Sequence, residues 1–201
     1  MDQIVAGIDI GGEKKGFHVV ALEGTRLVGL LHATEADGVA AWCLENRVTI
    51  VGLDAPCRWA IEGKSRPVER EMAKAGLSAY ATPTRERALT NQFYRWMLNG
   101  ERLYAAIEKH YPLFEGTRKP GRACFETFPS AVVAALAGRR LPAKDKRRNR
   151  PPLPQKAGID ISSLTSIDWI DAGLCALTAR HFADGTIRTY GEAMTGLIVV
   201  P

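Results

Sequence analysis

Residues 4–22 read IVAGIDIGGEKKGFHVVAL, and this stretch decides the fold class. Two apolar runs rich in β-branched residues flank a short turn of glycine and charged residues, a pattern that predicts a β-hairpin. Asp9 is the only charged residue in the first run. Burial of a lone carboxylate is unfavourable unless a partner compensates its charge. Asp9 therefore either binds a divalent metal ion or caps a turn, as aspartate often does.

The hairpin continues into a meander and then into a parallel strand. Residues 26–32 form a predicted third strand, antiparallel to the second, and residues 34–46 have the apolar spacing of a helix. Residues 48–53 are nearly all apolar, which is typical of a buried parallel strand. This strand ends at Asp54, and Pro56 prevents it from continuing. A second carboxylate is therefore predicted at the C-terminal end of a core strand.

Residues 57–121 differ from the strand-rich start, and we predict that they form a helical insertion packed on the sheet. A short helix is expected to begin at residues 65–67 and to end at Gly76. A longer helical pattern covers residues 86–111, with an interruption at Asn99-Gly100. Basic residues gather in this insertion, and a solvated surface is their simplest explanation: Arg58, Lys64, Arg66, Arg70, Arg85 and Arg87.

A further short strand and a basic run follow the insertion. Residues 123–128 form the predicted strand and contain Glu126, and a helix is expected over residues 130–137 because Pro129 suits its start. Residues 139–150 then carry a dense run of lysine and arginine. This run is either a mobile solvated loop or an arm that contacts phosphates.

The last long helix is predicted over residues 166–182. Asp168 and Asp171 lie three residues apart, so both carboxylates project from one side of this helix. Residues 172–177 are small and apolar, which indicates a helix buried against the sheet. Capping and the helix dipole explain Asp168 but explain Asp171 poorly. Residues 197–200 are expected to add an edge strand.

The bulk properties of the chain exclude several classes of protein. A chain of 201 residues suits a single domain over residues 1–201, and its net charge of +5 suits an anionic partner without requiring one. The four cysteines form no C-x-x-C pair, which favours the reducing cytoplasm. No apolar run reaches the roughly 20 residues that span a bilayer, and the N-terminus lacks a signal-peptide pattern, so no membrane partner is expected.

Five carboxylates occupy related positions in this arrangement. Asp9, Asp54 and Glu126 lie at or near strand ends, whereas Asp168 and Asp171 open the last helix. Sites in open α/β sheets form beyond the carboxyl ends of the strands. Crowded carboxylates raise one another's pKa unless a cation lies among them. Oxygen ligands without a cysteine or histidine cluster suit Mg²⁺ or Mn²⁺, and two such ions can promote phosphodiester hydrolysis.

The predicted order of strands and helices, with acids in these places, resembles the RNase H fold. Within that fold, it is most similar to the RuvC-type nuclease branch. More closely still, the chain resembles the domain of unknown function 429 family of predicted RNase H-like nucleases. The resemblance is carried by residues 7–9, 51–56, 66–70, 126–129 and 168–172. It implies an α/β fold with a mixed five-stranded sheet, in which three antiparallel strands precede the parallel ones, flanked by helices and carrying a helical insertion.

The resemblance also implies a nuclease that cleaves DNA or RNA with Mg²⁺ or Mn²⁺. The predicted catalytic residues are Asp9, Asp54, Glu126, Asp168 and Asp171, and all except Glu126 are predicted metal ligands. Glu126 could instead orient a water molecule or pair with Lys14 or Arg66. The predicted nucleic-acid contacts are Lys14, Lys15, Arg66, Arg70, Arg147, Arg148 and Arg150. No aromatic-rich platform for single strands is apparent in the sequence.

Two other functions stay open. One is a non-catalytic RNase H-like module that binds nucleic acid or a protein partner. The other is an ATP-dependent phosphotransferase, because the turn after Asp9 also resembles the phosphate-binding hairpin of sugar kinases and actins. Those proteins place two such domains around the nucleotide, whereas this chain has room for one and contains no second glycine-rich phosphate loop.

Overall fold

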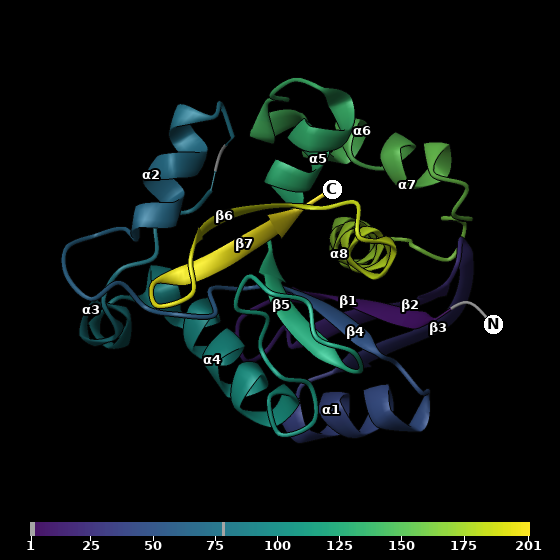
Figure 1. The fold of residues 1–201 in the computed structure, drawn as a ribbon, viewed down its shortest axis with the longest axis horizontal. Helices are drawn as coiled ribbons and strands as arrows, with labels where there is room; N and C mark the ends of the chain where they lie inside the picture. The colour runs from purple at the N-terminus through teal and green to yellow at the C-terminus, as the bar shows by residue number, and fades with distance from the viewer. Residues whose placement is uncertain (1–2, 78) are drawn as a thin grey trace.

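The computed structural model of the protein describes residues 3–77 and 79–201, which form one mixed sheet with helices on both faces (Figure 1). The sheet has seven strands in the order β3-β2-β1-β4-β5-β7-β6. In chain order they are β1 (Ile4–Ile10), β2 (Phe17–Glu23), β3 (Arg26–Ala33), β4 (Ile50–Asp54), β5 (Ala123–Thr127), β6 (Arg188–Glu192) and β7 (Gly196–Val200). β1, β2 and β3 are antiparallel neighbours, and β4 runs parallel to β1. This arrangement is consistent with the RNase H-like α/β sheet that the sequence predicts.

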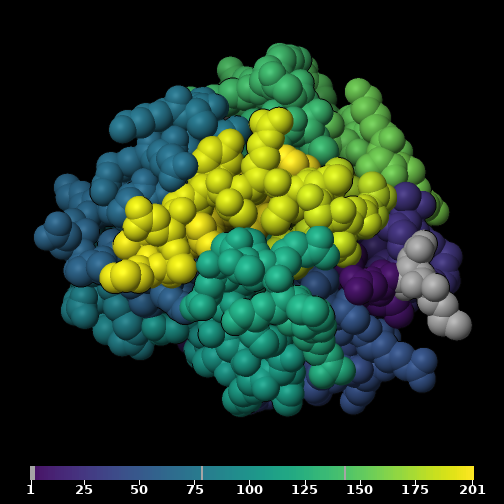
Figure 2. Space-filling view, viewed as in Figure 1, coloured from purple at the N-terminus to yellow at the C-terminus, as the bar shows by residue number. Residues whose placement is uncertain are grey.

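The sheet is larger than the five strands predicted. β7 corresponds to the expected edge strand, but it lies inside the sheet, parallel to β5, because β6 pairs with its other side. All five residues of β7 are buried, whereas those of β6 are exposed or half-buried. This exposure matches the sequence of β6, which lacks the apolar alternation that identifies a strand, so the strand is not predicted. Figure 2 shows this C-terminal hairpin in yellow, on the molecular surface between the blue and green parts of the chain.

Helices cover both faces of the sheet. α1 (Ala36–Glu45) and α4 (Arg95–Ile107) lie on one face, and α5 (Pro129–Ala137) and α8 (Ile167–Asp184) lie on the other (Figure 1). The shorter elements are α2 (Pro67–Lys74), α3 (Arg85–Thr90), α6 (Lys146–Asn149), α7 (Pro152–Lys156) and the 3₁₀ turns η1 (Gln92–Tyr94) and η2 (Ala143–Asp145). In the described ranges, no helix has the length and hydropathy needed to cross a membrane.

Two glycines allow α8 to lie directly on the middle of the sheet. A Cβ atom at Gly7 of β1 would lie 1.9 Å from the backbone nitrogen of Ala176. A Cβ atom at Gly52 of β4 would lie 2.9 Å from the carbonyl oxygen of Cys175. Only glycine permits such an approach of helix and strand backbones. The close packing places the first turns of α8 beside the carboxyl ends of β1 and β4.

Residues 57–121 contain α2, α3, η1 and α4, but the helical pattern breaks at a different place than predicted. The break occurs at Asn91, whose side chain caps η1. α4 continues without interruption through Asn99 and Gly100. A Cβ atom at Gly100 would lie 2.5 Å from that of Ala55, and Asn99 Nδ2 donates a hydrogen bond to the Gly11 carbonyl oxygen at 2.9 Å. These two residues therefore join α4 to the sheet and do not end the helix.

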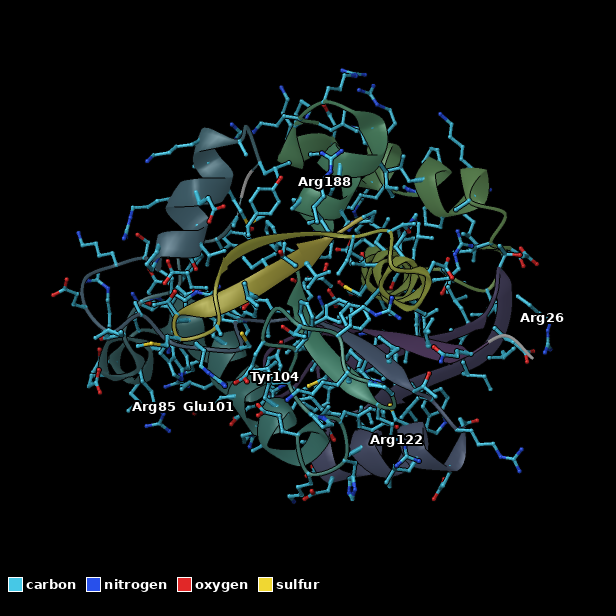
Figure 3. All side chains as sticks on the ribbon, in the orientation of Figure 1. Arg26, Arg85, Glu101, Tyr104, Arg122 and Arg188 are labelled. Carbon is cyan, nitrogen blue, oxygen red and sulfur yellow. The ribbon has the colours of Figure 1, made fainter. Side chains whose placement is uncertain are left out.

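Polar contacts also fix α3 and the segment after β4 onto α4. Figure 3 labels Arg85 of α3 and Glu101 of α4, which lie together. Arg85 Nε lies 2.8 Å from Glu101 Oε1, and the indole nitrogen of Trp59 donates to the same oxygen at 2.7 Å. One carboxylate thereby links three parts of the insertion.

Candidate functional site

Asp9 and Asp54 are neighbours at the carboxyl ends of two parallel strands. They are register partners between β1 and β4. Each lies two residues after a glycine that contacts α8, and side chains two residues apart along a strand share a face of the sheet. Both carboxylates therefore lie on the α8 face, and Asp9 is only 7% exposed.

The beginning of α8 brings two more carboxylates to this place. The hydroxyl of Ser166 caps the helix by accepting a hydrogen bond from the backbone nitrogen of Trp169 at 3.3 Å. Asp168 lies in the first turn, and Asp171 follows one turn later with 4% exposure. All four aspartates line one cleft of about 250 Å³. We refer to it as the acidic cleft.

Burial and crowding change the proton affinities of these carboxylates. Burial, followed by the charges of Asp171 and Asp168, raises the pKa of Asp9 from 3.8 to about 7. Burial, followed by the charge of Asp9, raises the pKa of Asp54 well above its ordinary value. The acidic cleft therefore favours a bound proton or a bound cation near neutral pH.

Basic side chains offset the charge of the two helix aspartates. Lys15 Nζ lies 2.7 Å from Asp168 Oδ1. Arg150 forms a buried ion pair with Asp171 and donates a hydrogen bond to Ser130 Oγ at 2.7 Å. Burial still raises the pKa of Asp171, although the charge of Arg150 opposes the shift.

The two strand aspartates lack such compensation. Among residues 3–77 and 79–201, neither Asp9 nor Asp54 forms an ion pair with a basic side chain. Lys15 and Lys146 also line the acidic cleft, and their charges lower the pKa of Asp9 less than burial raises it. The two carboxylates without an ion-pair partner in the described ranges therefore lie at the ends of β1 and β4.

His18 belongs to this site although the sequence analysis did not select it. It lies on β2 directly opposite Asp9, and one of its ring nitrogens lies within 4.8 Å of carboxylate oxygens of Asp9 and Asp168. Its Nδ1 is buried and has no hydrogen-bond partner in the part of the chain that the structure describes. Burial, followed by the charge of His32, lowers the pKa of His18 and favours the neutral form that binds metals. The signal in the sequence was a polar residue in an apolar strand, opposite Asp9 in the hairpin.

Glu126 lies apart from the four aspartates. Its register partner on β4 is Leu53, which packs in the core on the α1 and α4 side, so Glu126 faces away from Asp54. Its carboxylate accepts hydrogen bonds from Arg66 at 2.8 and 2.6 Å and from the backbone nitrogen of Cys57 at 2.9 Å. Of the alternatives for Glu126, the structure contains the pair with Arg66.

The predicted nucleic-acid contacts fall into three groups. Arg66 is 1% exposed and is held between Glu69 and Glu126, so it lies inside the protein. Lys15 and Arg150 line the acidic cleft. Lys14, Arg70, Arg147 and Arg148 are exposed and do not line the acidic cleft.

A larger cavity of about 440 Å³ lies between residues 59–67, Arg70 and Thr195. Its lining contains one acidic residue, Glu62, and several basic ones. Such a lining does not provide the converging oxygen ligands that a divalent metal ion requires. Of these two cavities, the smaller acidic cleft is the one whose carboxylate oxygens could hold a divalent metal ion.

Comparison with known proteins places nearly the whole chain in one family. Residues 7–195 match the family described as "Protein of unknown function (DUF429)". No curated protein and no solved structure matches the chain.

Proposed function

The chain belongs to the DUF429 family, and we propose that it is a nuclease that hydrolyses phosphodiester bonds in DNA or RNA with the help of divalent metal ions. The observation that carries the proposal is the convergence of Asp9, Asp54, Asp168 and Asp171 on the acidic cleft. Asp9 is buried, Asp54 beside it is half-buried, and both have raised pKa values, an arrangement that a divalent cation would stabilise.

The donor atoms of the acidic cleft fit Mg²⁺ or Mn²⁺. Asp9 and Asp54 supply carboxylate oxygens from the sheet, and Asp168 and Asp171 supply them from α8. A ring nitrogen of His18, within 4.8 Å of Asp9 and Asp168 oxygens, offers a nitrogen donor, which Mn²⁺ accepts more readily than Mg²⁺ does. When bound, such ions lower the pKa of an attacking water and stabilise the charge that develops on the leaving oxygen.

The protein's own cations have two different roles in this proposal. Lys15 and Lys146 line the acidic cleft and can bind the non-bridging oxygens of a phosphate. On substrate binding, the ammonium group of Lys15 would leave Asp168 and pair with the phosphate. Arg150 is a positioning residue, because its contacts to Asp171 and Ser130 fix the orientation of the Asp171 carboxylate.

A second candidate function is a module that binds nucleic acid without cleaving it. The ion pairs Lys15–Asp168 and Arg150–Asp171 favour this function, because they compensate both helix aspartates without a metal ion. Asp9 and Asp54 form no ion pair in the described ranges, and such a module would keep them crowded together at an energetic disadvantage. The nuclease is therefore the better account of the complete site.

The proposal is tested by a cleavage assay with Mg²⁺ or Mn²⁺ on single-stranded, duplex and branched DNA and on RNA. The wild-type protein should cleave at least one of these substrates and should lose activity in EDTA. Asp9→Asn and Asp54→Asn should abolish cleavage, whereas the control Asp184→Asn, at the exposed end of α8, should not. If the wild type cleaves nothing, or if Asp9→Asn cleaves equally well, the non-catalytic module becomes the better account.

A further inference from the structure

Aromatic side chains line part of the acidic cleft. Tyr80, Trp96 and Phe128 border it together with the four aspartates. The ring centroid of Tyr80 lies 6.3 Å from that of Trp96, 5.6 Å from that of Phe128 and 6.5 Å from that of Phe93, all in edge-to-face geometry. We call these four residues the aromatic wall. The sequence did not reveal it because its members are separated by up to 48 positions, from 80 to 128.

Two rings of the aromatic wall are accessible. Tyr80 is 58% exposed and Phe93 is 61% exposed, whereas Trp96 and Phe128 are partly buried. Aromatic rings stabilise a fold mainly through the apolar surface that they bury. A role in packing explains Trp96 and Phe128, but it leaves most of Tyr80 and Phe93 unexplained. Their free surfaces indicate a binding platform that is fixed in place by the two inner rings.

The surroundings of the aromatic wall identify the kind of ligand. Lys15 and Lys146 line the same cleft as Tyr80, Trp96 and Phe128, and Phe93 adjoins Tyr80. A nucleic-acid strand carries phosphates, which bind such cations, and bases, which stack on aromatic rings. An apolar protein segment would use the rings but would leave the charged part of the cleft without a complement.

We propose that the aromatic wall stacks on an unpaired base beside the phosphate bound in the acidic cleft, so that the substrate is single-stranded or locally unpaired nucleic acid. This inference rests on the proposed function and names its substrate class. In a duplex, neighbouring bases cover both faces of each base, and a face becomes free only after unstacking. Tyr80, Phe93 and Trp96 come from the insertion, whereas the catalytic aspartates come from the sheet and α8. The insertion therefore determines substrate choice.

The test is a binding measurement in EDTA, where no cleavage occurs. Fluorescence anisotropy compares a single-stranded DNA oligonucleotide with the duplex of the same sequence, and 2-aminopurine in the strand reports stacking through quenching of its fluorescence. The wild type should bind the single strand more tightly and quench 2-aminopurine. The double variant Tyr80→Ala, Phe93→Ala should bind at least about tenfold more weakly and lose the quenching. The variants Tyr80→Phe and Phe93→Tyr keep the rings and should retain both signals.

Met194→Ala serves as the control, because Met194 is 84% exposed on the turn between β6 and β7 and lies outside the acidic cleft. Equal affinity for single strand and duplex, or unchanged quenching in the double alanine variant, would overturn the inference. The nuclease proposal fails separately: a wild type that stacks single strands but cleaves nothing contradicts the nuclease and leaves the aromatic wall as a binding site.

Discussion

The carboxylate of Asp9 is buried beside other acids, and its pKa of about 7 makes it destabilising in the metal-free protein at neutral pH. Between its ordinary pKa of 3.8 and about 7, the folded state holds a proton that the unfolded state has released. Folding stability therefore falls as the pH rises through this interval. Asparagine cannot ionise, so Asp9→Asn should be more stable than the wild type at about pH 8 and should show little such gain at about pH 4.

Urea unfolding in EDTA at several pH values measures this difference. Asp184→Asn is the control, since Asp184 is exposed and lies at the far end of α8. A loss of stability in Asp9→Asn that is equal at all pH values would show that the carboxylate is needed for the fold and is not strained by its neighbours.

Glu126 should affect stability and not metal binding. It forms a buried ion pair with Arg66, whose side chain is 1% exposed. Removing one partner of such a pair leaves an uncompensated charge in the interior. Glu126→Gln should therefore lower the free energy of unfolding by about 3 kcal/mol, as measured in urea, and leave Mn²⁺ affinity unchanged. A stable Glu126→Gln variant that fails to bind Mn²⁺ would contradict this assignment.

The acids were the part of the site that the sequence could reveal, because a charged residue in an apolar run is visible without a structure. Their grouping was harder to predict. In the sequence, Glu126 resembles Asp9 and Asp54, because each is an acid near the end of an apolar strand. The register between β4 and β5 places the Glu126 side chain on the other face of the sheet. Register between strands that are distant in sequence is not encoded locally. Arg150 was one of many basic residues in its run, and nothing nearby in the sequence indicated its buried pair with Asp171.

The packing of α8 on β1 determines the geometry of the acidic cleft. A Cβ atom at Gly7 would collide with the backbone of α8 at 1.9 Å, so Gly7→Ala should displace the helix and separate Asp168 and Asp171 from Asp9. We expect a loss of about 1–3 kcal/mol of stability, typical of overpacking, together with weaker Mn²⁺ binding. Urea unfolding and metal titration measure the two effects.

Gly12→Ala is the matched control, because a Cβ atom at Gly12 would have no heavy atom within 4 Å. It should leave stability and metal binding nearly unchanged. If Gly7→Ala behaves in the same way as Gly12→Ala, the close contact between α8 and β1 does not control the site.

Most elements of the fold follow from local patterns in the sequence. The hairpin, the buried β4 run and the small apolar residues of α8 each have one dominant period or composition, and the structure contains all three. β6 is not predicted, because its residues do not alternate between apolar and polar and so define no apolar face. Asn99-Gly100 has the local composition of a helix break. The contact that requires glycine there, between Gly100 and Ala55, joins residues 45 positions apart, from 55 to 100, and a local pattern does not show it.

The exposed arginines of α6 should act together on nucleic acid, whereas basic residues far from the acidic cleft should not. Arg147 and Arg148 are exposed on α6, whose first residue, Lys146, lines the acidic cleft. If both contact phosphates, Arg147→Ala, Arg148→Ala should weaken binding similarly for all sequences and should reduce the salt slope by about 2. The double variant Arg26→Ala, Lys109→Ala removes the same charge elsewhere and should not change the slope. Equal slopes for the two double variants would show that the basic run is a solvated loop.

The central claim is that the acidic cleft binds a divalent metal ion, and Mn²⁺ titration followed by electron paramagnetic resonance tests it most directly. The wild type should bind Mn²⁺, Asp9→Asn should not, and Asp184→Asn should bind as the wild type does. His18→Gln should weaken Mn²⁺ binding more than Mg²⁺ binding, because it removes the nitrogen donor. No bound Mn²⁺ in the wild type, or equal binding by Asp9→Asn, would contradict the claim.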